Sequence, residues 1–355
     1  MSNTNERNYG IDLLRLVSMF LVCLRHTLSQ GGVLAASSEI SNAIYSFLFI
    51  LTSSAVDCFA IISGYFATNK KIKFEKIIKM WFQVLFYSFG ISLAINVLRI
   101  VFSSPEGFEL SYVISSLFPL LNHRYWYFSA YVILFFFMPF LNKAFLDLNK
   151  EESKRTLLVL FILMIIMCYF RNASSHNFLS EGRSAFWLII MYIVGLLINK
   201  SGFLGKTKQK TLILYFLSLN VLSFILSYYY NVETSINIYP ISWLEAIVLV
   251  KIFEKMNVDE KIVSFLSPLS FGVFLFNTHY YFKYYFLSER FINYSAVNTV
   301  YGFVVVLFTS LFVFVAGLLA DFIRTKVFKL FKIDILSKKI CNSIESILHR
   351  LSTFM

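Results

Sequence analysis

The sequence predicts an all-α, polytopic integral membrane protein with about ten membrane-spanning helices. Apolar residues make up 58% of the 355 residues and charged residues only 15%, whereas soluble domains carry roughly 25% charged residues. The mean hydropathy of +0.69 points the same way. Because the chain has too little polar surface to cover a water-soluble core, the bilayer is its expected solvent.

Ten apolar runs are long enough, or nearly long enough, to supply the about 20 residues that a spanning helix needs. The first run contains several charged residues and lacks a small-x-small cleavage site, which indicates a retained helix and not a signal peptide. We expect a membrane domain over residues 1–323 and a basic amphipathic tail over 324–355 on the anionic inner leaflet. The predicted helices are 10–29, 44–67, 78–102, 125–145, 156–170, 184–199, 211–230, 239–254, 269–287 and 299–323.

The distribution of Lys and Arg predicts the orientation, because cytoplasmic loops carry an excess of both. With the N-terminus in the cytoplasm, most of the 32 Lys and Arg fall in cytoplasmic segments, and the C-terminus is cytoplasmic too. This placement explains the net charge of +12 without a nucleic-acid partner. The outer loop at about 103–124 is long enough to fold over an outer opening. The predicted outer segments and adjoining helix ends hold Arg99, Arg124, Arg171, Arg183, Lys283 and Arg290.

The four cysteines are widely spaced along the chain, with no CxxC pair. Such a distribution favours small apolar residues in helices over a zinc site. We therefore expect no metal.

Polar residues are concentrated in the first predicted helix. At 100° per residue, Arg15 and His26 lie within about 20° of each other on one face, and Asp12 lies about 40° away on the other side. Arg15 and His26 are about 16 Å apart along the axis, too far for direct contact. Asp12 and Arg15 can also be a snorkelling interfacial pair, His26 a structural histidine, and Arg25, about 100° away, an outer anchor.

The second predicted helix carries Asp57 in the middle of an apolar run, where a charge needs a partner. Gly64 follows seven residues later on the same face, directly after Ser63. A glycine at this place lets a helix or a ligand approach closely, so simple helix packing is the alternative to a binding role for this pair.

Three stretches in order resemble the membrane acyltransferase 3 family, the bacterial O-acyltransferases of surface polysaccharides. The resemblance covers the first four helices best and fits the whole chain in length and helix number. Arg15-x10-His26 matches the family's first-helix motif, and Ser63-Gly64-x-Phe66 matches its second. The stretches are Asn8-Tyr9-Gly10-Ile11-Asp12-Leu13-Leu14-Arg15 to His26, Val56-Asp57-Cys58-Phe59 with Ser63-Gly64-Tyr65-Phe66, and Tyr125-Trp126-Tyr127-Phe128-Ser129-Ala130-Tyr131 to Pro139-Phe140-Leu141-Asn142.

The sequence departs from the family pattern in two places. An Arg-x-x-Arg pair of many members is replaced by Lys76 and Lys79, which keeps the charge but loses the bidentate fork for phosphate. The late-helix histidine of the family is Asn277 here, with His279 two residues further on. The roles of Asn277 and His279 therefore stay open.

The resemblance implies transfer of an acyl group, usually acetyl, from acetyl-CoA to a sugar hydroxyl at the bacterial inner membrane. His26 is the candidate general base, because an imidazole suits proton transfer near neutral pH. Asp57 is the candidate that orients it, and Arg15 binds the donor or stabilises developing negative charge.

The remaining candidates bind the two substrates. Lys76 and Lys79 are assigned to the phosphates of coenzyme A, with ordinary loop charge as the alternative, and the donor site also includes Ser63 and Gly64. A platform for the sugar ring is expected at the outer end of the fourth predicted helix. The alternative is that its residues belong to the aromatic belt at the membrane interface. The platform consists of Trp126, Tyr127 and Ser129.

Two other function classes compete with this one. A transporter, flippase or polymerase of lipid-linked glycans also has many helices and few intramembrane charges, but it does not need the Arg15-x10-His26 motif. A degenerate family member that assists export without catalysis is the third possibility. The retained Arg15, His26 and Asp57 favour the enzyme. The sequence names neither the sugar, the hydroxyl nor the oligomeric state.

Overall fold

The computed structural model describes residues 7–354, apart from residues 38, 69–72, 123, 171–179 and 294–298. Helices joined by turns and loops make up this part of the chain, and no strand occurs in it. The predicted all-α class is therefore confirmed. Residue 355 and most of the predicted outer loop 171–183 lie outside the described residues.

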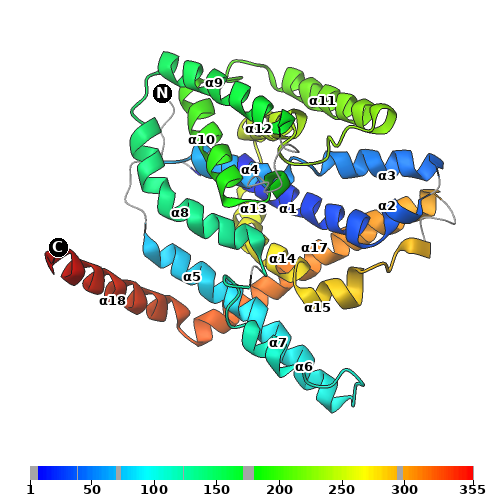
Figure 1. Ribbon diagram of the computed structural model, residues 1–355, viewed down its shortest axis with the longest axis vertical. Helices are drawn as coiled ribbons and strands as arrows, with labels where there is room; N and C mark the ends of the chain where they lie inside the picture. The colour runs from blue at the N-terminus through cyan, green and yellow to red at the C-terminus, as the bar shows by residue number, and fades with distance from the viewer. Residues whose placement is uncertain are drawn as a thin grey trace.

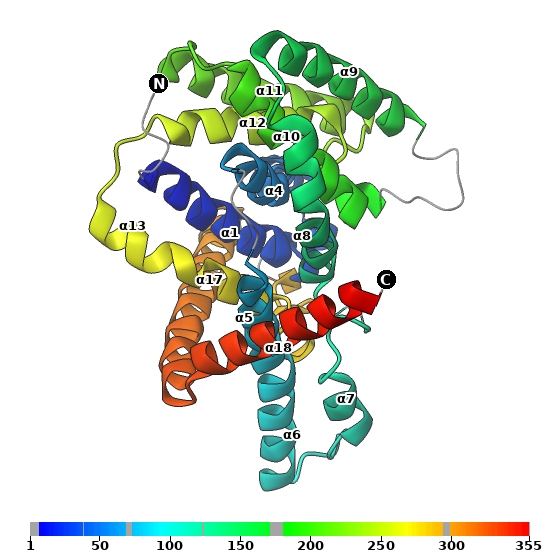
Figure 2. The same cartoon turned by 90° about the vertical axis from the view of Figure 1, so that its left-hand side faces the viewer.

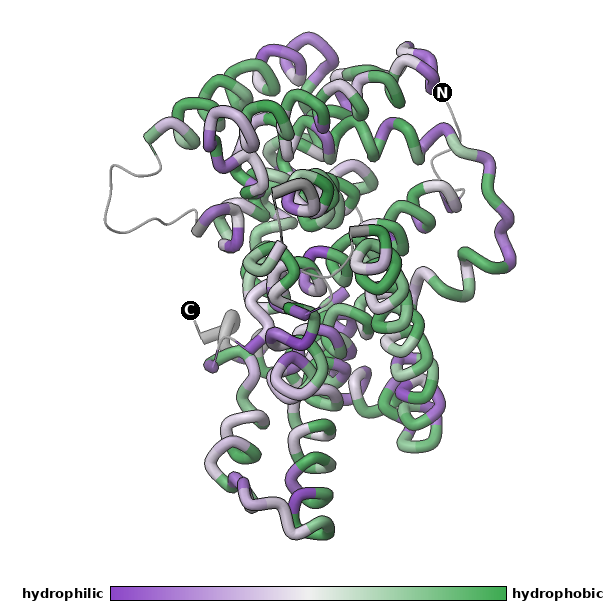
Figure 3. The backbone as a smooth tube through the Cα atoms, turned by 90° about the vertical axis from the view of Figure 1, so that its right-hand side faces the viewer, coloured by the Kyte–Doolittle hydropathy of each residue, from purple (hydrophilic) through white to green (hydrophobic). Residues whose placement is uncertain are grey.

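All ten predicted ranges fall on helices, which Figure 1 shows in chain order, although 44–67 is interrupted at residues 52–54 and 269–287 at residues 278–279. Figure 3 shows that hydrophobic residues cover most of the helical tube. The elements are α1 (Tyr9–Gln30), α2 (Val33–Ala36), α3 (Glu39–Leu51), α4 (Ala55–Tyr65), α5 (Phe74–Leu85), the π-helix η1 (Phe86–Ile91), α6 (Ser92–Val101), α7 (Leu110–Ser115), α8 (Trp126–Phe145), α9 (Lys150–Tyr169), η2 (Ser180–Gly182), α10 (Ala185–Ser201), α11 (Gln209–Tyr230), α12 (Pro240–Glu254), α13 (Glu260–Leu266), η3 (Ser267–Leu269), α14 (Ser270–Asn277), α15 (Tyr280–Phe282), the π-helix η4 (Lys283–Leu287), α17 (Thr299–Leu330) and α18 (Ile333–Phe354).

Length and apolar composition identify five candidate membrane spans in the described part of the chain. A bent pair, Glu260–Asn277 with Tyr280–Leu287, makes a sixth if its halves form one span, and they meet at 66°. Helix α10 is apolar but shorter, and the polar stripe of α1 keeps that helix out of the set. The crossing number of ten therefore stays a prediction. The five spans are Ser41–Tyr65, Phe74–Val101, Trp126–Phe145, Gln209–Tyr230 and Val300–Leu330.

Helix α1 lies in the middle of the bundle, where it contacts α4, α12, α14 and α17 (Figures 1 and 2). Its N-terminus is capped by Asn8, whose side chain accepts a hydrogen bond from the backbone N–H of Ile11 (3.0 Å). The start of α1 and the end of α18 lie toward the same side, on the left in Figure 1. That this side is the cytoplasm stays a prediction.

Glycines bring α4 and α10 into close contact. A Cβ atom on Gly64 would lie 1.9 Å from the carbonyl oxygen of Tyr192, and one on Gly195 would lie 2.2 Å from that of Ile61. The two backbones therefore touch, as they do in membrane helix pairs with small interfacial residues. This contact fixes α4 against α10, and α4 also packs on α1, where it forms a wall of the candidate site.

Helix α18 crosses α5, as Figure 2 shows. Lys79 of α5 joins the two helices, because its Nζ atom lies 2.8 Å from a carboxylate oxygen of Glu75 and 2.8 Å from one of Asp334. The tail is thus attached to the helix that carries the predicted donor lysines.

Candidate active site

A cavity of about 590 Å³ runs alongside α1. Seven α1 residues line it, and five of them are spaced by three and four residues, so these five share one face of the helix. Arg15 and His26 are both among them, which confirms that their spacing places them on a common surface. From Arg15 to Gln30 the cavity follows α1 for about 22 Å. The five side chains are Arg15, Met19, Val22, His26 and Ser29.

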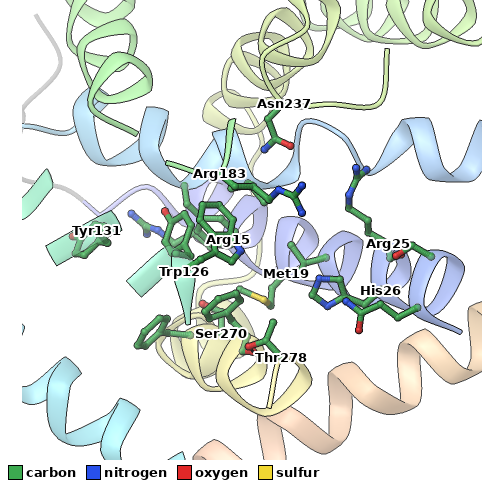
Figure 4. A pocket seen from close by; sticks show the side chains of 18 of the residues that line it. Arg15, Met19, Arg25, His26, Trp126, Tyr131, Arg183, Asn237, Ser270 and Thr278 are labelled. Carbon is green, nitrogen blue, oxygen red and sulfur yellow. Dashed lines mark hydrogen bonds between the residues drawn. The ribbon is translucent and has the colours of Figure 1, made fainter. Parts of the chain in front are cut away.

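The opposite walls come from segments far apart in the sequence (Figure 4). Val56, Phe59 and Ser63 of α4 form one side, and Ser270, Phe271 and Phe274 of α14 form another. Arg183 and Asn237 reach in from the connections that precede α10 and α12. Apolar and polar side chains both line the cavity, and we call its two ends the Arg15 end and the Arg25 end.

His26 is held by Asn277 of α14, whose amide nitrogen lies 2.8 Å from the imidazole Nδ1 atom. A 180° rotation about χ2 of Asn277 exchanges the positions of its side-chain nitrogen and oxygen. The Asn277 oxygen is buried without a hydrogen bond in the described part of the chain. In the rotated arrangement this oxygen accepts a hydrogen bond from Nδ1–H, and Nε2 keeps the lone pair that a general base needs.

Arg15 lies at the other end of the cavity, paired with Asp12 one turn earlier. Asp12 is buried, does not line the cavity, and also binds Arg7 (2.5 Å) and the Ser267 hydroxyl (3.2 Å). Since Asp12 is fully engaged, it anchors the guanidinium at the cavity end. Arg15 is too far along the axis to act on a group that His26 touches.

Asp57 contacts neither His26 nor the cavity. Its carboxylate accepts a hydrogen bond from the indole N–H of Trp187 (2.9 Å), and Asn237 lies beside it. The structure thus differs from the expectation that Asp57 orients the imidazole, because Asn277 occupies that place. Trp187 lies 130 positions away in the chain, so no local pattern reveals this pairing.

The predicted donor residues separate into two groups. Ser63 lines the cavity, although its hydroxyl donates to the carbonyl oxygen of Phe59 (2.8 Å). Gly64 faces α10, so helix packing explains its presence. Lys76 is exposed and Lys79 binds acidic partners, and neither lines the cavity.

Aromatic side chains from α8 form a wall of the cavity. Trp126 and Tyr127 line it, as predicted for the sugar platform, together with Tyr131, whose ring stacks on that of Tyr127 at 6.4 Å. Ser129 does not line it, and its hydroxyl is buried without a hydrogen bond in the described region. The platform is therefore Trp126 and Tyr127, extended by Tyr131.

Four cations at the Arg25 end were missed as site residues in the sequence. Arg25 turns toward the cavity, and its guanidinium donates to the Thr52 hydroxyl (3.2 Å) and the Ser235 carbonyl (2.9 Å). In a sequence, a cation that lines a site cannot be distinguished from one that anchors a helix at the membrane interface. Only the structure shows that these four cations line the same cavity. The four are Arg25, Arg124, Arg183 and Lys283.

A second cavity of about 430 Å³ adjoins this end. Arg124, Thr278 and Lys283 line both cavities. His279 and Tyr112, which lies in the predicted outer loop, line the second one, and the covering of an outer opening by this loop stays a prediction. The His279 side chain also caps α15, where its Nδ1 atom accepts from the backbone N–H of Tyr281 (3.3 Å).

Asp321 is a buried carboxylate outside the cavities that has a charged partner, whereas the buried Glu245 has no ion pair among the described residues. Arg324 donates two hydrogen bonds of 2.8 Å to Asp321, which also accepts one from Gln83 (2.8 Å). Such networks avoid the cost of an isolated charge in an apolar surrounding. No group of His, Cys, Asp or Glu that suits a metal ion occurs among the residues the structure describes.

Comparison with known proteins gives one match, to a protein family. Residues 8–319 match the family described as the Acyltransferase domain, which is the acyltransferase 3 family that the motifs resemble. No curated protein and no solved structure matches the chain. The match covers most of the 355 residues, including every predicted site residue. With its apolar helices, the chain is a multi-pass membrane protein that belongs to the acyltransferase 3 family.

Proposed function

We propose that this acyltransferase moves an acetyl group from acetyl-CoA to a hydroxyl of a cell-surface polysaccharide, an exopolysaccharide, or its lipid-linked precursor, in the bacterial inner membrane. One observation carries the proposal: His26, fixed by Asn277, lies on the same cavity as Arg15, and the cavity follows α1 between them. A donor that enters at one end can then meet an acceptor that enters at the other.

His26 serves as the general base. Its Nε2 atom takes the proton of the sugar hydroxyl while the hydroxyl oxygen attacks the thioester carbonyl carbon. The tetrahedral intermediate then collapses, the C–S bond breaks, and the imidazolium returns the proton to the departing sulfur. The products are the sugar ester and coenzyme A with a free thiol, so His26 ends neutral.

The donor occupies the Arg15 end. Arg15 supplies a positive charge to it, and Met19, Val22 and Phe59 form an apolar passage toward His26. Ser63 adds a hydroxyl to this passage. The exposed Lys76 attracts the coenzyme A phosphates from the cytoplasm, whereas Lys79 serves mainly to hold α18.

The acceptor occupies the Arg25 end. Farther along the cavity, Trp126, which lies beside Arg15 in Figure 4, and Tyr127 give flat apolar faces on which a sugar ring can stack, and Asn237 adds an amide. Asp57, bound to Trp187, supports this end through α4 and α10 and does not touch the reacting groups.

A direct assay tests the proposal. The purified protein in nanodiscs is incubated with radiolabelled acetyl-CoA and glycan from cells that lack this protein, and the label in base-labile ester is measured. We expect ester formation with the wild-type protein and none without it. Hydrolysis of acetyl-CoA with no labelled glycan would contradict the proposed acceptor class, and no use of acetyl-CoA would contradict the donor.

A further inference from the structure

Cations without a carboxylate partner gather at the Arg25 end. Among the described residues Arg25 binds only neutral groups, and Arg124 binds the Tyr112 carbonyl (3.3 Å) and the Ser115 hydroxyl (2.5 Å). No ion pair involves Lys283 there, whereas the neighbouring Arg183 is paired with Glu181 (2.6 Å). These three positive charges thus line one cavity with no ion pair of their own among the described residues, and the one carboxylate in the cavity lining, Glu181, is paired with Arg183.

Such an arrangement is costly in a membrane protein. Charges at membrane depth persist where they pair with an opposite charge or line a functional path. The Nε atom of Arg124 is moreover buried with no hydrogen-bond partner in the described part of the chain, and a donor of this kind usually has one. Both observations indicate that an anion belongs at this place.

The location identifies which anion fits. Arg124 and Lys283 border both cavities, so a bound anion lies at their junction. The second cavity adds the rings of Tyr112 and Tyr280 and the amide of Asn122. Aromatic faces with amide groups suit a sugar ring, whereas coenzyme A is expected at the opposite end, near Arg15.

We propose that the acceptor is an anionic sugar, and that Arg25, Arg124 and Lys283 bind its phosphate or carboxylate beside the hydroxyl that is acylated. The inference rests on the proposed function and names the class of its acceptor. Arg25 and Lys283 lie close enough to interact electrostatically with the His26 ring. Positive charge beside a base opposes the uptake of a proton, so a bound anion also removes a penalty from the transfer step.

Binding measurements test this without any need for turnover. The protein in nanodiscs is titrated calorimetrically with glucose 1-phosphate, glucuronate, neutral glucose and coenzyme A. Two variants are compared, Lys283→Gln alone and Arg124→Gln with Lys283→Gln. The matched control, Arg155→Gln with Lys210→Gln, removes one Arg and one Lys that are exposed on α9 and α11.

We expect at least one anionic sugar to bind about tenfold tighter than glucose, and the double variant to lose that preference, because hydrogen bonds to charged groups are stronger than those between neutral groups. The control variant and coenzyme A binding should not change. Lys283→Gln, at an exposed position, should weaken binding several-fold even if the double variant does not fold.

Three results would overturn the inference: equal binding of glucose and both anions, equal loss in the control variant, or loss of coenzyme A binding in place of sugar binding. Acetyl transfer with no anion preference would reject this inference and leave the proposed function intact. Anion binding without acetyl transfer would reject the proposed function and leave the anion site intact.

Discussion

The side-chain amide of Asn277 lies 2.8 Å from the imidazole Nδ1 atom of His26, although the two residues are 251 positions apart. This contact joins α1 to α14 at the centre of the proposed site. It gives the asparagine, which replaces the histidine of the family pattern, the task of positioning the base.

Replacing Asn277 with Leu should lower kcat by about 10–10²-fold with little change in KM, because losing a buried hydrogen bond costs roughly 1–3 kcal/mol. Asn277→Asp should retain more activity than Asn277→Leu, since a carboxylate also accepts from Nδ1–H. Kinetics of the purified variants, at equal amounts of folded protein, measure both. Equal loss in the two variants would indicate a packing role.

A tautomer measurement separates positioning from packing. In a ¹⁵N-histidine spectrum, the signals that disappear in His26→Ala belong to His26. Wild-type protein should show Nδ1 protonated and Nε2 unprotonated, and Asn277→Leu should show a mixture. An Nε2–H tautomer in the wild type would contradict the role of His26 as base.

Gly64→Ala should destabilise the protein strongly, because a Cβ there would lie 1.9 Å from the Tyr192 carbonyl oxygen. Overpacking costs typically about 1–3 kcal/mol, and backbone cannot move as a side chain does. Gly90→Ala is the matched control, since a Cβ at Gly90 has no atom within 4 Å. Thermal unfolding in detergent measures both. Equal melting temperatures would rule out the close α4–α10 contact.

The pair Lys79–Asp334 should attach α18 to α5. Lys79→Asp should release the tail to proteolysis, and the double variant Lys79→Asp with Asp334→Lys should restore its protection. An exposed pair contributes roughly 0.2–1 kcal/mol, so the measurement is the rate of limited proteolysis. If the swap restores tail protection but coenzyme A binding remains weak, Lys79 also contacts the donor.

Topology is tested by single cysteines in a cysteine-free background. A cysteine at position 73 should resist an impermeant reagent in intact cells, and one at position 172 should react, because the positive charges of the predicted loops favour this orientation. Inside-out vesicles should reverse the pattern. Labelling of position 73 from outside would contradict the proposed sides of donor and acceptor.

The sequence predicts the helices and the common face of Arg15 and His26 correctly, because hydrophobic runs and the 3.6-residue period are local properties. The partners of these residues depend on tertiary contacts. Two hydrogen bonds join segments more than 100 positions apart in the chain: one between Trp187 and Asp57, the other between Asn277 and His26. Gly64 is recognisable as a close-approach position, but only the structure shows that α10, and not a ligand, approaches it.

The central claim is that His26 is the base of an acyl transfer, and two substitutions at that position test it most directly. General-base catalysis is typically worth 10²–10⁴-fold in rate. His26→Gln keeps a side-chain amide that can bind Asn277 but cannot take a proton, whereas His26→Ala removes both properties. His176→Ala, at a position outside the described residues, is the matched histidine control.

The measurement is O-acetylation of cell-surface glycan at equal protein level, with each variant as the cell's only copy. The account predicts loss of acetylation in both His26 variants, normal acetylation in His176→Ala, and membrane levels near wild type for all three. Wild-type acetylation in His26→Gln would contradict it, since a glutamine that restores activity means that His26 serves only as a hydrogen-bonding residue.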